Sequence, residues 1–202
     1  MGYTRRQFGA LTAAVTVFGA GCLGDSEPDE EDLLEVPTIG DPDADVTVTV
    51  YEDFGCPACG EYKLNTYPEV YERYIESEAI SYEHRDFPIP ADDWSEPVAS
   101  AARSVQDQSD DETFFDFTAE IYRYMDQYSL DVIEQVADEV GVDGEQVRAD
   151  ADDVTYQDGL DADRAYGEQQ GVEATPTVFV DGEHVEDWSA TSVINAIEAA
   201  LE

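Results

Sequence analysis

The fold is decided by the stretch Val46-Thr47-Val48-Thr49-Val50-Tyr51 and, shortly after it, Cys56-Pro57-Ala58-Cys59. The first stretch alternates at a period of two, which predicts a strand. The second places two cysteines where a helix is expected to begin, and free backbone N–H groups and the helix dipole stabilise a thiolate there. Two thiols at this spacing can close and reopen a small disulfide ring, which is the chemistry of thiol–disulfide exchange.

Two other interpretations of the cysteine pair are open. A zinc site needs two further ligands, and the other candidates, Cys22, His84 and His184, form no second paired spacing. A purely structural disulfide is also conceivable, but so short a loop adds little stability by restricting the unfolded chain. We therefore interpret Cys56 and Cys59 as a redox-active pair that needs no metal and no other cofactor.

The first residues of the chain have the pattern of an export signal. Thr4-Arg5-Arg6-Gln7-Phe8 is a twin-arginine pattern, with Arg5 and Arg6 as its signal residues. Residues 9–21 are small and modestly apolar, and this run is shorter than the about 20 residues of a spanning helix. We predict that residues 1–21 are a twin-arginine signal and that the protein acts outside the cytoplasm, where disulfides persist.

The signal ends on a pattern that resembles a lipobox, Ala20-Gly21-Cys22. In a lipobox the cysteine is lipidated and becomes the first residue of the mature protein. Gly19 departs from the bulkier aliphatic residue usual at its position, so cleavage without lipidation stays an alternative. We expect a protein anchored to the outer face of the cell membrane through Cys22, or a secreted protein if Cys22 carries no lipid.

The composition is strongly acidic. The chain has 49 acidic and 9 basic residues, a formal net charge of −40, and Lys63 as its single lysine. Such a chain repels nucleic acid and anionic membrane surfaces, so neither is an expected partner. Its 12 Tyr and 8 Phe argue for a packed core rather than a disordered acidic chain. The composition resembles that of proteins from halophilic archaea, where salt screens charges to a Debye length of about 3 Å at 1 M.

Residues 22–38 are expected to form an acidic tether and residues 39–202 a single domain. Apolar patterning predicts strands at 46–51, 79–87 and 177–180, a turn at Asp181-Gly182, and a partner strand that begins at His184. It also predicts a helix over 56–77 that is interrupted at Pro68, and a mostly helical block over about 92–170.

Single residues indicate where some of these helices end or begin. Gly141 and Gly144 are expected to stop helices, and Ser189 is expected to cap a final helix.

This order resembles a thioredoxin fold with an inserted helical domain, and specifically the DsbA-like family of thiol–disulfide oxidoreductases. The resemblance covers about residues 39–201 and is carried by three segments. They are Asp53-Phe54-Gly55-Cys56-Pro57-Ala58-Cys59, His84-Arg85-Asp86-Phe87-Pro88 followed by Trp94-Ser95-Glu96-Pro97, and Gly171-Val172-Glu173-Ala174-Thr175-Pro176-Thr177-Val178-Phe179-Val180-Asp181-Gly182. The fold class is therefore expected to be α/β, with the helical domain between the second strand and the loop at Pro176.

Residue roles follow from the chemistry and from this resemblance. Cys56 is the expected nucleophile, because it lies at the helix N-terminus, and Cys59, one turn inward, is the expected resolving thiol. Pro57 suits the first turn of the helix. The resemblance implies that the bond before Pro176 is cis, and that the backbone of Thr175 pairs with an extended substrate segment.

Two positions depart from the family pattern. Members often carry an acid six residues before the first cysteine, thought to relay a proton from the inner thiol, and Val50 stands there. Glu52 is a possible substitute, although we expect it to be a solvated surface acid. Strongly oxidising members have a histidine where this chain has Ala58, so we expect a milder oxidant. Its potential should lie between about −120 mV and about −270 mV.

The sequence therefore predicts an extracytoplasmic thiol–disulfide oxidoreductase that acts on exported proteins, with oxidation as the favoured direction. An oxidase would be reoxidised by a membrane partner, for which a quinone-linked protein is the candidate. A reductase or isomerase of the same fold stays open, and so does a holdase that binds unfolded proteins. His84 is expected to be a packed or surface histidine rather than a base, and His184 is expected to be a hairpin residue.

Overall fold

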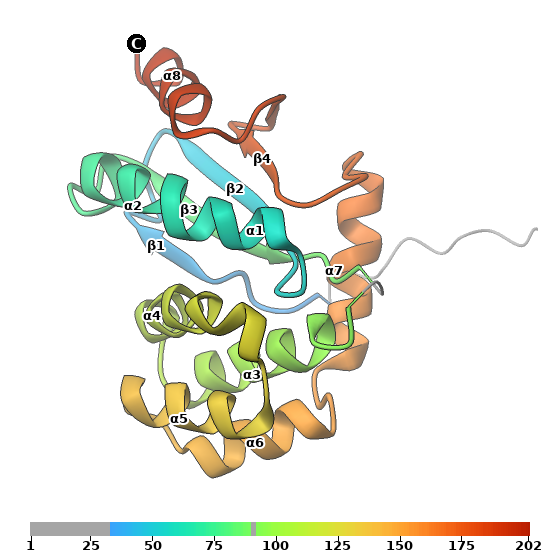
Figure 1. Cartoon of the computed structure of the whole chain (residues 1–202). Helices are drawn as coiled ribbons and strands as arrows, with labels where there is room; N and C mark the ends of the chain where they lie inside the picture. Colours follow the sequence, from blue (N-terminus) through green and yellow to red (C-terminus); the bar gives the residue numbers. More distant parts are fainter. Residues whose placement is uncertain (1–32, 90–91) are drawn as a thin grey trace, which may run out of the picture.

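The computed structural model describes residues 33–89 and 92–202 of the chain (Figure 1). The predicted export signal, with Arg5 and Arg6, and the predicted lipidation site at Cys22 lie outside the described residues. Among the helices that are described, none combines the length and the apolar character needed to cross a membrane.

A five-stranded mixed sheet forms the centre of the molecule, in the order β1-β3-β2-β4-β5. Strands β2 and β3 are parallel, and every other neighbouring pair is antiparallel. The predicted strands are confirmed with shifts of one or two residues at their ends, and the sequence analysis missed β1. The strands are β1 (Thr38–Gly40), β2 (Thr47–Glu52), β3 (Ser81–Asp86), β4 (Thr177–Val180) and β5 (Glu183–Val185).

The helix after the cysteine pair runs without a break through Pro68, so the predicted interruption is wrong. Its segments are α1 (Pro57–Glu61), η2 (Tyr62–Thr66), α2 (Tyr67–Val70) and η3 (Tyr71–Ile75). Proline lacks an N–H for an ordinary helical hydrogen bond. The helix widens into a π turn just before it, where the Tyr67 N–H donates to the carbonyl of Tyr62 five residues back.

The predicted helical block is confirmed, and a final helix follows β5. The segments are α3 (Ser95–Gln108), α4 (Asp111–Ile121), η4 (Tyr122–Gln127), α5 (Leu130–Val140), α6 (Gly144–Asp152), α7 (Gln157–Gln169) and α8 (Ala190–Ala200). Ser189 caps α8 as predicted, since its hydroxyl accepts a hydrogen bond from the Ser192 N–H at 3.4 Å.

Of the two glycines predicted to stop helices, one does so and the other does not. Gly141 ends α5 with a φ of 94°, which glycine adopts without strain. Gly144 instead begins α6, after the cap residue Asp143. Glycine is needed there for space, because a Cβ would lie 2.5 Å from the Glu134 carbonyl oxygen.

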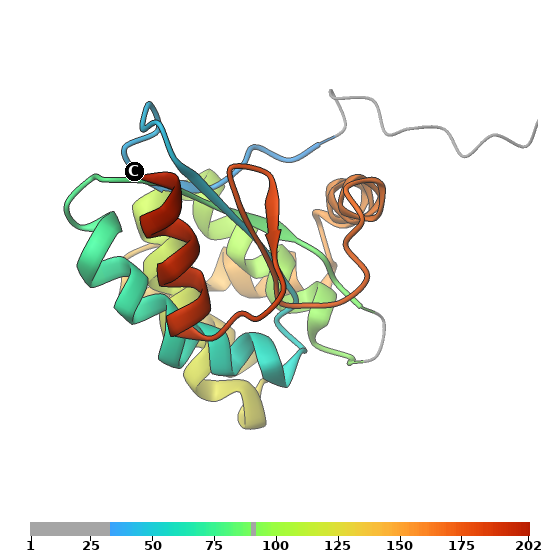
Figure 2. The same ribbon diagram turned by 90° about the horizontal axis from the view of Figure 1, so that it is seen from above.

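Helices cover both faces of the sheet. In Figure 2 the helix over residues 57–75 and α8 lie on one side of the strands, and α7 lies on the other. Helix α7 packs so closely that a Cβ at Gly167 would lie 2.7 Å from the Phe87 ring. Helices α3 to α6 extend beyond the β1 edge (Figure 1), and one continuous core joins them to the sheet.

Candidate active site

An aspartate loop holds the cysteine pair at the end of β2. Asp53 Oδ1 accepts a hydrogen bond from the Gly55 N–H at 2.8 Å, and its Oδ2 accepts one from the Ile89 N–H at 3.0 Å. Gly55 leaves no room for a side chain, since a Cβ would lie 2.4 Å from Ser95 Oγ. The sequence analysis named Asp53 in this segment but did not predict that it holds the loop, although Asp-x-Gly is a recognisable turn signal.

Cys56 lies at the N-cap of α1 with an extended backbone, and its thiol is half-buried. Its Sγ lies 3.3 Å from the Thr175 carbonyl oxygen. The pKa of Cys56 is lowered to about 6, first by a hydrogen bond from Cys59 and further by the Cys59 and Ala58 N–H groups, which together outweigh partial burial. A thiol with this pKa is mostly thiolate at neutral pH, which makes it the more reactive thiol of the pair.

Cys59 has the opposite environment, because its side chain is fully buried. The Asp53 N–H lies 3.4 Å from its Sγ. Burial raises the pKa of Cys59 well above its usual range, and the hydrogen bond to Cys56 and the charge of Glu52 raise it further. Both cysteines are free thiols in this structure. One is therefore ionised and reachable, while the other is protonated and protected, which is the asymmetry that exchange requires.

The loop before β4 faces Cys56. The Thr175–Pro176 peptide bond is cis, as predicted. Thr175 is largely buried, and its carbonyl oxygen is the atom next to the Cys56 thiol. The structure therefore brings together the residues that the sequence predicted for the two sides of this site, Cys56 and Cys59 on one side and Thr175 and Pro176 on the other.

Glu52 is not the solvated acid that we expected. It is 1% exposed and lies with Lys63 and His84 inside the protein. Lys63 Nζ lies 2.9 Å from Glu52 Oε2, and His84 Nδ1 lies 3.0 Å from the same oxygen. Burial alone would raise the pKa of Glu52, but Lys63 and His84 outweigh it and lower the pKa. Val50, where the family often has an acid, is an ordinary core residue.

The buried charges continue from His84 into the inserted helices. His84 Nε2 lies 3.1 Å from Asp86 Oδ1, and Arg103 Nε donates to Asp86 Oδ2 at 2.6 Å. Arg103 Nη2 then reaches Asp163 Oδ2 of α7 at 3.1 Å. The pairing of Arg103 and His84 with Asp86 outweighs its burial and lowers the pKa of Asp86 to about 2. A chain of charged groups thus joins the sheet beneath the cysteines to α3 and α7.

The sequence analysis missed the roles of Lys63 and Arg103. Lys63 had one signal, being the single lysine of an acidic chain. Arg103 interrupts an apolar helical pattern between Ala102 and Val105 and is 1% exposed. His84 is buried, which is one of the two environments expected for it. His184 lies exposed on β5. Among the described residues, no group of three or more His, Cys, Asp or Glu is placed to hold a metal ion.

The fold and the paired thiols define the structural class of this protein. It has a thioredoxin fold with an inserted helical domain, and its two-cysteine site lies at the first turn of its first long helix. A family model described as Thioredoxin matches residues 34–199. The chain belongs to this family.

Solved structures share this architecture. Oxidised BdbD from Bacillus subtilis superposes with a TM-score of 0.75 at 19% identity, over 87% of this chain and 96% of that one. DsbA from Chlamydia trachomatis also gives 0.75, at 22% identity, over 85% of this chain and 95% of that one. At these identities the likeness establishes the fold.

Curated relatives are of two kinds. An Na(+)/H(+) antiporter NhaA 1 of a Mycobacterium species is 31% identical over 79% of this chain, but this chain spans only 26% of the antiporter's length. A probable disulfide bond formation protein D of Bacillus cereus is 27% identical over 72% of this chain and 69% of that protein. The relatives thus include a protein named for disulfide bond formation and a longer protein with a different name.

Proposed function

We propose that this protein is a thiol–disulfide oxidoreductase of the DsbA and BdbD type, which exchanges disulfides with exported proteins and works chiefly as an oxidase. The observation that carries the proposal is the contrast between the two thiols. Cys56 has a pKa near 6 at a reachable helix start, and Cys59 is buried with a raised pKa. The name of the Bacillus cereus relative supports the same chemistry.

The reaction transfers two electrons, and each of its steps breaks one sulfur–sulfur bond and forms another. A client thiolate attacks Cys56 Sγ of the oxidised pair, the Cys56–Cys59 bond breaks, and the electrons of that bond leave with Cys59, which takes up a proton. A second client thiolate then attacks the client sulfur of the mixed disulfide and releases Cys56 as a thiolate. The client gains a disulfide, and the enzyme is left as the dithiol, which the expected membrane partner would reoxidise.

The client would bind across the loop at Thr175. Its extended backbone would pair with the backbone of Thr175 as an added strand, with the cysteine of the client directed to Cys56. Thr175 supports this role because its carbonyl oxygen already lies 3.3 Å from Cys56 Sγ.

We propose an extracytoplasmic location, with export through the Arg5-Arg6 signal and anchoring through Cys22. The support is the sequence pattern alone. In this setting concentrated salt would screen the acidic surface, as in the halophilic proteins that the composition resembles.

Three serine variants test the activity, one for each cysteine of the chain. Cys56→Ser should abolish both the oxidation of a reduced, unfolded client and the reduction of insulin, at molar salt. Cys59→Ser should trap a mixed disulfide with the client. Cys22→Ser is the matched control, since it should keep full exchange activity while releasing the protein from the membrane fraction. Exchange activity that survives in Cys56→Ser contradicts the proposed function.

The reductase or isomerase direction is the alternative, and Ala58 favours it because its side chain, unlike that of histidine, cannot donate a hydrogen bond to the Cys56 thiolate. An equilibrium potential measured against glutathione decides the direction. A value below about −250 mV would favour reduction of clients over their oxidation.

A further inference from the structure

His84 uses both nitrogens of a fully buried ring. Nδ1 lies 3.0 Å from Glu52 Oε2, and Nε2 lies 3.1 Å from Asp86 Oδ1. Aromatic rings pack against the imidazole, with the Phe54 centroid at 5.8 Å and the Phe114 centroid at 5.1 Å. The imidazole is therefore held between two carboxyl groups and cut off from water.

Counting protons limits what this arrangement can be. An ionised carboxylate only accepts hydrogen bonds, and a neutral imidazole has one N–H to donate. Two hydrogen bonds from carboxyl to ring to carboxyl therefore require two protons among Glu52, His84 and Asp86. Either the ring holds both as an imidazolium, or the ring and one carboxyl hold one each.

The surrounding cations favour the imidazolium. Lys63 Nζ lies 2.9 Å from Glu52, and Arg103 Nε lies 2.6 Å from Asp86, so both carboxyl groups are stabilised as anions. Burial alone would lower the pKa of His84, but the hydrogen bonds with Asp86 and Glu52 outweigh it and raise the pKa. The charged groups that contact the ring are Glu52 of β2 and Asp86 of β3. Lys63 of η2 and the Cys59 thiol of α1 lie near Glu52, Arg103 of α3 pairs with Asp86, and Asp163 of α7 lies beyond Arg103.

This arrangement leaves one oxygen of Glu52 unused beneath the cysteines. Glu52 Oε2 is shared by Lys63 and His84, whereas Glu52 Oε1 is buried and has no hydrogen-bond partner among the described residues. Glu52 is near enough to Cys59 for its charge to raise the pKa of that thiol. An ionised carboxylate with a free oxygen is a suitable proton acceptor in a site closed to water.

We propose that His84 is a positioning residue of the exchange reaction: as an imidazolium between Glu52 and Asp86, it keeps Glu52 ionised, with Oε1 free to take the proton of Cys59. This inference rests on the proposed function. When Cys59 resolves the mixed disulfide between Cys56 and a client, its S–H proton passes to Glu52 and its sulfur forms a bond to Cys56. The bond between Cys56 and the client breaks, and the client thiolate leaves with the electron pair. In the oxidising direction, Glu52 returns the proton to Cys59.

Histidine NMR tests the proton count without any substitution in the site. The chain has only two histidines, so ¹⁵N-histidine labelling gives two ring systems, and His184→Gln assigns them. In the reduced full-length protein at molar salt, both ring nitrogens of His84 should have imidazolium shifts at pH 7 and above pH 8. A neutral-tautomer pattern at pH 7, with one protonated and one bare nitrogen, overturns the proposal.

Reaction of the reduced protein with 5,5′-dithiobis(2-nitrobenzoate) tests the positioning role. Cys56 attacks the reagent and releases one thionitrobenzoate, and Cys59 then resolves the mixed disulfide and releases a second. In His84→Gln the acid limb of the second release should move up by about one pH unit, because the buried base loses its charge partner. On that limb the second release should slow by up to about tenfold. The first release should stay within about twofold.

His184→Gln, on exposed β5, is the matched control and should leave both releases unchanged. A folded His84→Gln protein with an unchanged second release, or with both releases slowed equally, overturns the positioning role. A failure of the proposed function can be told apart from this result. If the protein is not an oxidoreductase, the unaltered protein itself will show no second release of thionitrobenzoate. If His84→Gln does not fold, the NMR measurement on the unaltered ring decides.

Discussion

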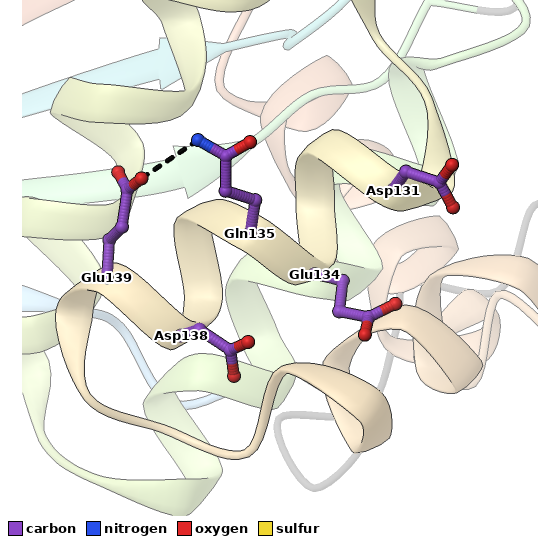
Figure 3. Close-up of a pocket in the computed structure, with 5 residues that line it drawn as sticks. All are labelled: Asp131, Glu134, Gln135, Asp138 and Glu139. Carbon is purple, nitrogen blue, oxygen red and sulfur yellow. Dashed lines mark hydrogen bonds between the residues drawn. The ribbon is translucent and has the colours of Figure 1, made fainter.

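Charged residues occupy two opposite environments in this molecule. Beneath the cysteines, Glu52, Asp86 and Asp163 are buried, and each contacts a cationic side chain. On α5 the acidic side chains lie at the surface, where Glu139 accepts a hydrogen bond from Gln135 (Figure 3) and Asp138 accepts one from the Gly144 N–H. These side chains are Asp131, Glu134, Asp138 and Glu139, and Arg148 of α6 is the cation that reaches the first two.

The comparison shows that the same residue types do different work according to burial. A buried ion pair fixes the positions of its partners, because separating them leaves a charge without water. A surface carboxylate mainly keeps the protein dissolved and contributes little to the fold. The strongly acidic composition is therefore a property of surfaces such as α5, whereas the few basic residues include two that are nearly inaccessible, Lys63 and Arg103.

The largest expected effect separates two arginines. Arg103→Met should reduce the free energy of unfolding by about 3–5 kcal/mol, because Asp86 and Asp163 would stay buried without their shared cation. Arg148→Met, which loses only surface pairs with Asp131 and Glu134, should cost about 0–1 kcal/mol. Urea denaturation of both variants at one fixed salt concentration measures the difference. Equal losses would remove the distinction between the two environments.

A smaller effect should appear in the pH dependence of the reduced protein. Cys56 has a folded pKa of about 6, below its value in the unfolded chain, so its contribution to stability is present above the unfolded pKa. That contribution is lost as the pH falls through 6. The stability of the reduced protein relative to reduced Cys56→Ser should therefore rise from pH 6 to 9. Urea denaturation across this range checks the sign, and a flat difference would contradict it.

The smallest effect is expected on α5. Glu139→Gln should change the free energy of unfolding by no more than about 0.5 kcal/mol. At low salt the change should be stabilising, because one of several neighbouring like charges is removed. At molar salt the Debye length is about 3 Å, and the difference should vanish. Denaturation at the two salt concentrations measures it, and a large loss at high salt would show that the α5 carboxylates have a structural role.

Local patterns were enough to predict much of the fold. Alternation predicted β2, and the apolar run Thr177–Val180 predicted β4 with its observed bounds. Ser189 as a cap and Gly141 as a stop follow from backbone chemistry within a single turn. Strand β1, with three residues, is too short to show a period, and its pairing with β3 depends on segments more than forty positions apart.

The sequence predicted the cysteine chemistry of the site but not the buried charged residues beneath it. The Cys56–Cys59 spacing and the Thr175-Pro176 dipeptide are both visible in a single line of sequence. The burial of Glu52 is not visible there, because a carboxylate at the end of a strand is usually solvated. It is tolerated in the interior because Lys63 and His84 are brought to it from two other elements.

Burial of the single lysine has a practical consequence. The side chain of Lys63 is 0% exposed in its pair with Glu52, and the chain has no other lysine. An acylating reagent can therefore modify a side-chain amine only in molecules whose interior has opened next to Cys59. The rate of acylation at this one position would report how often the floor of the site becomes accessible in the native protein.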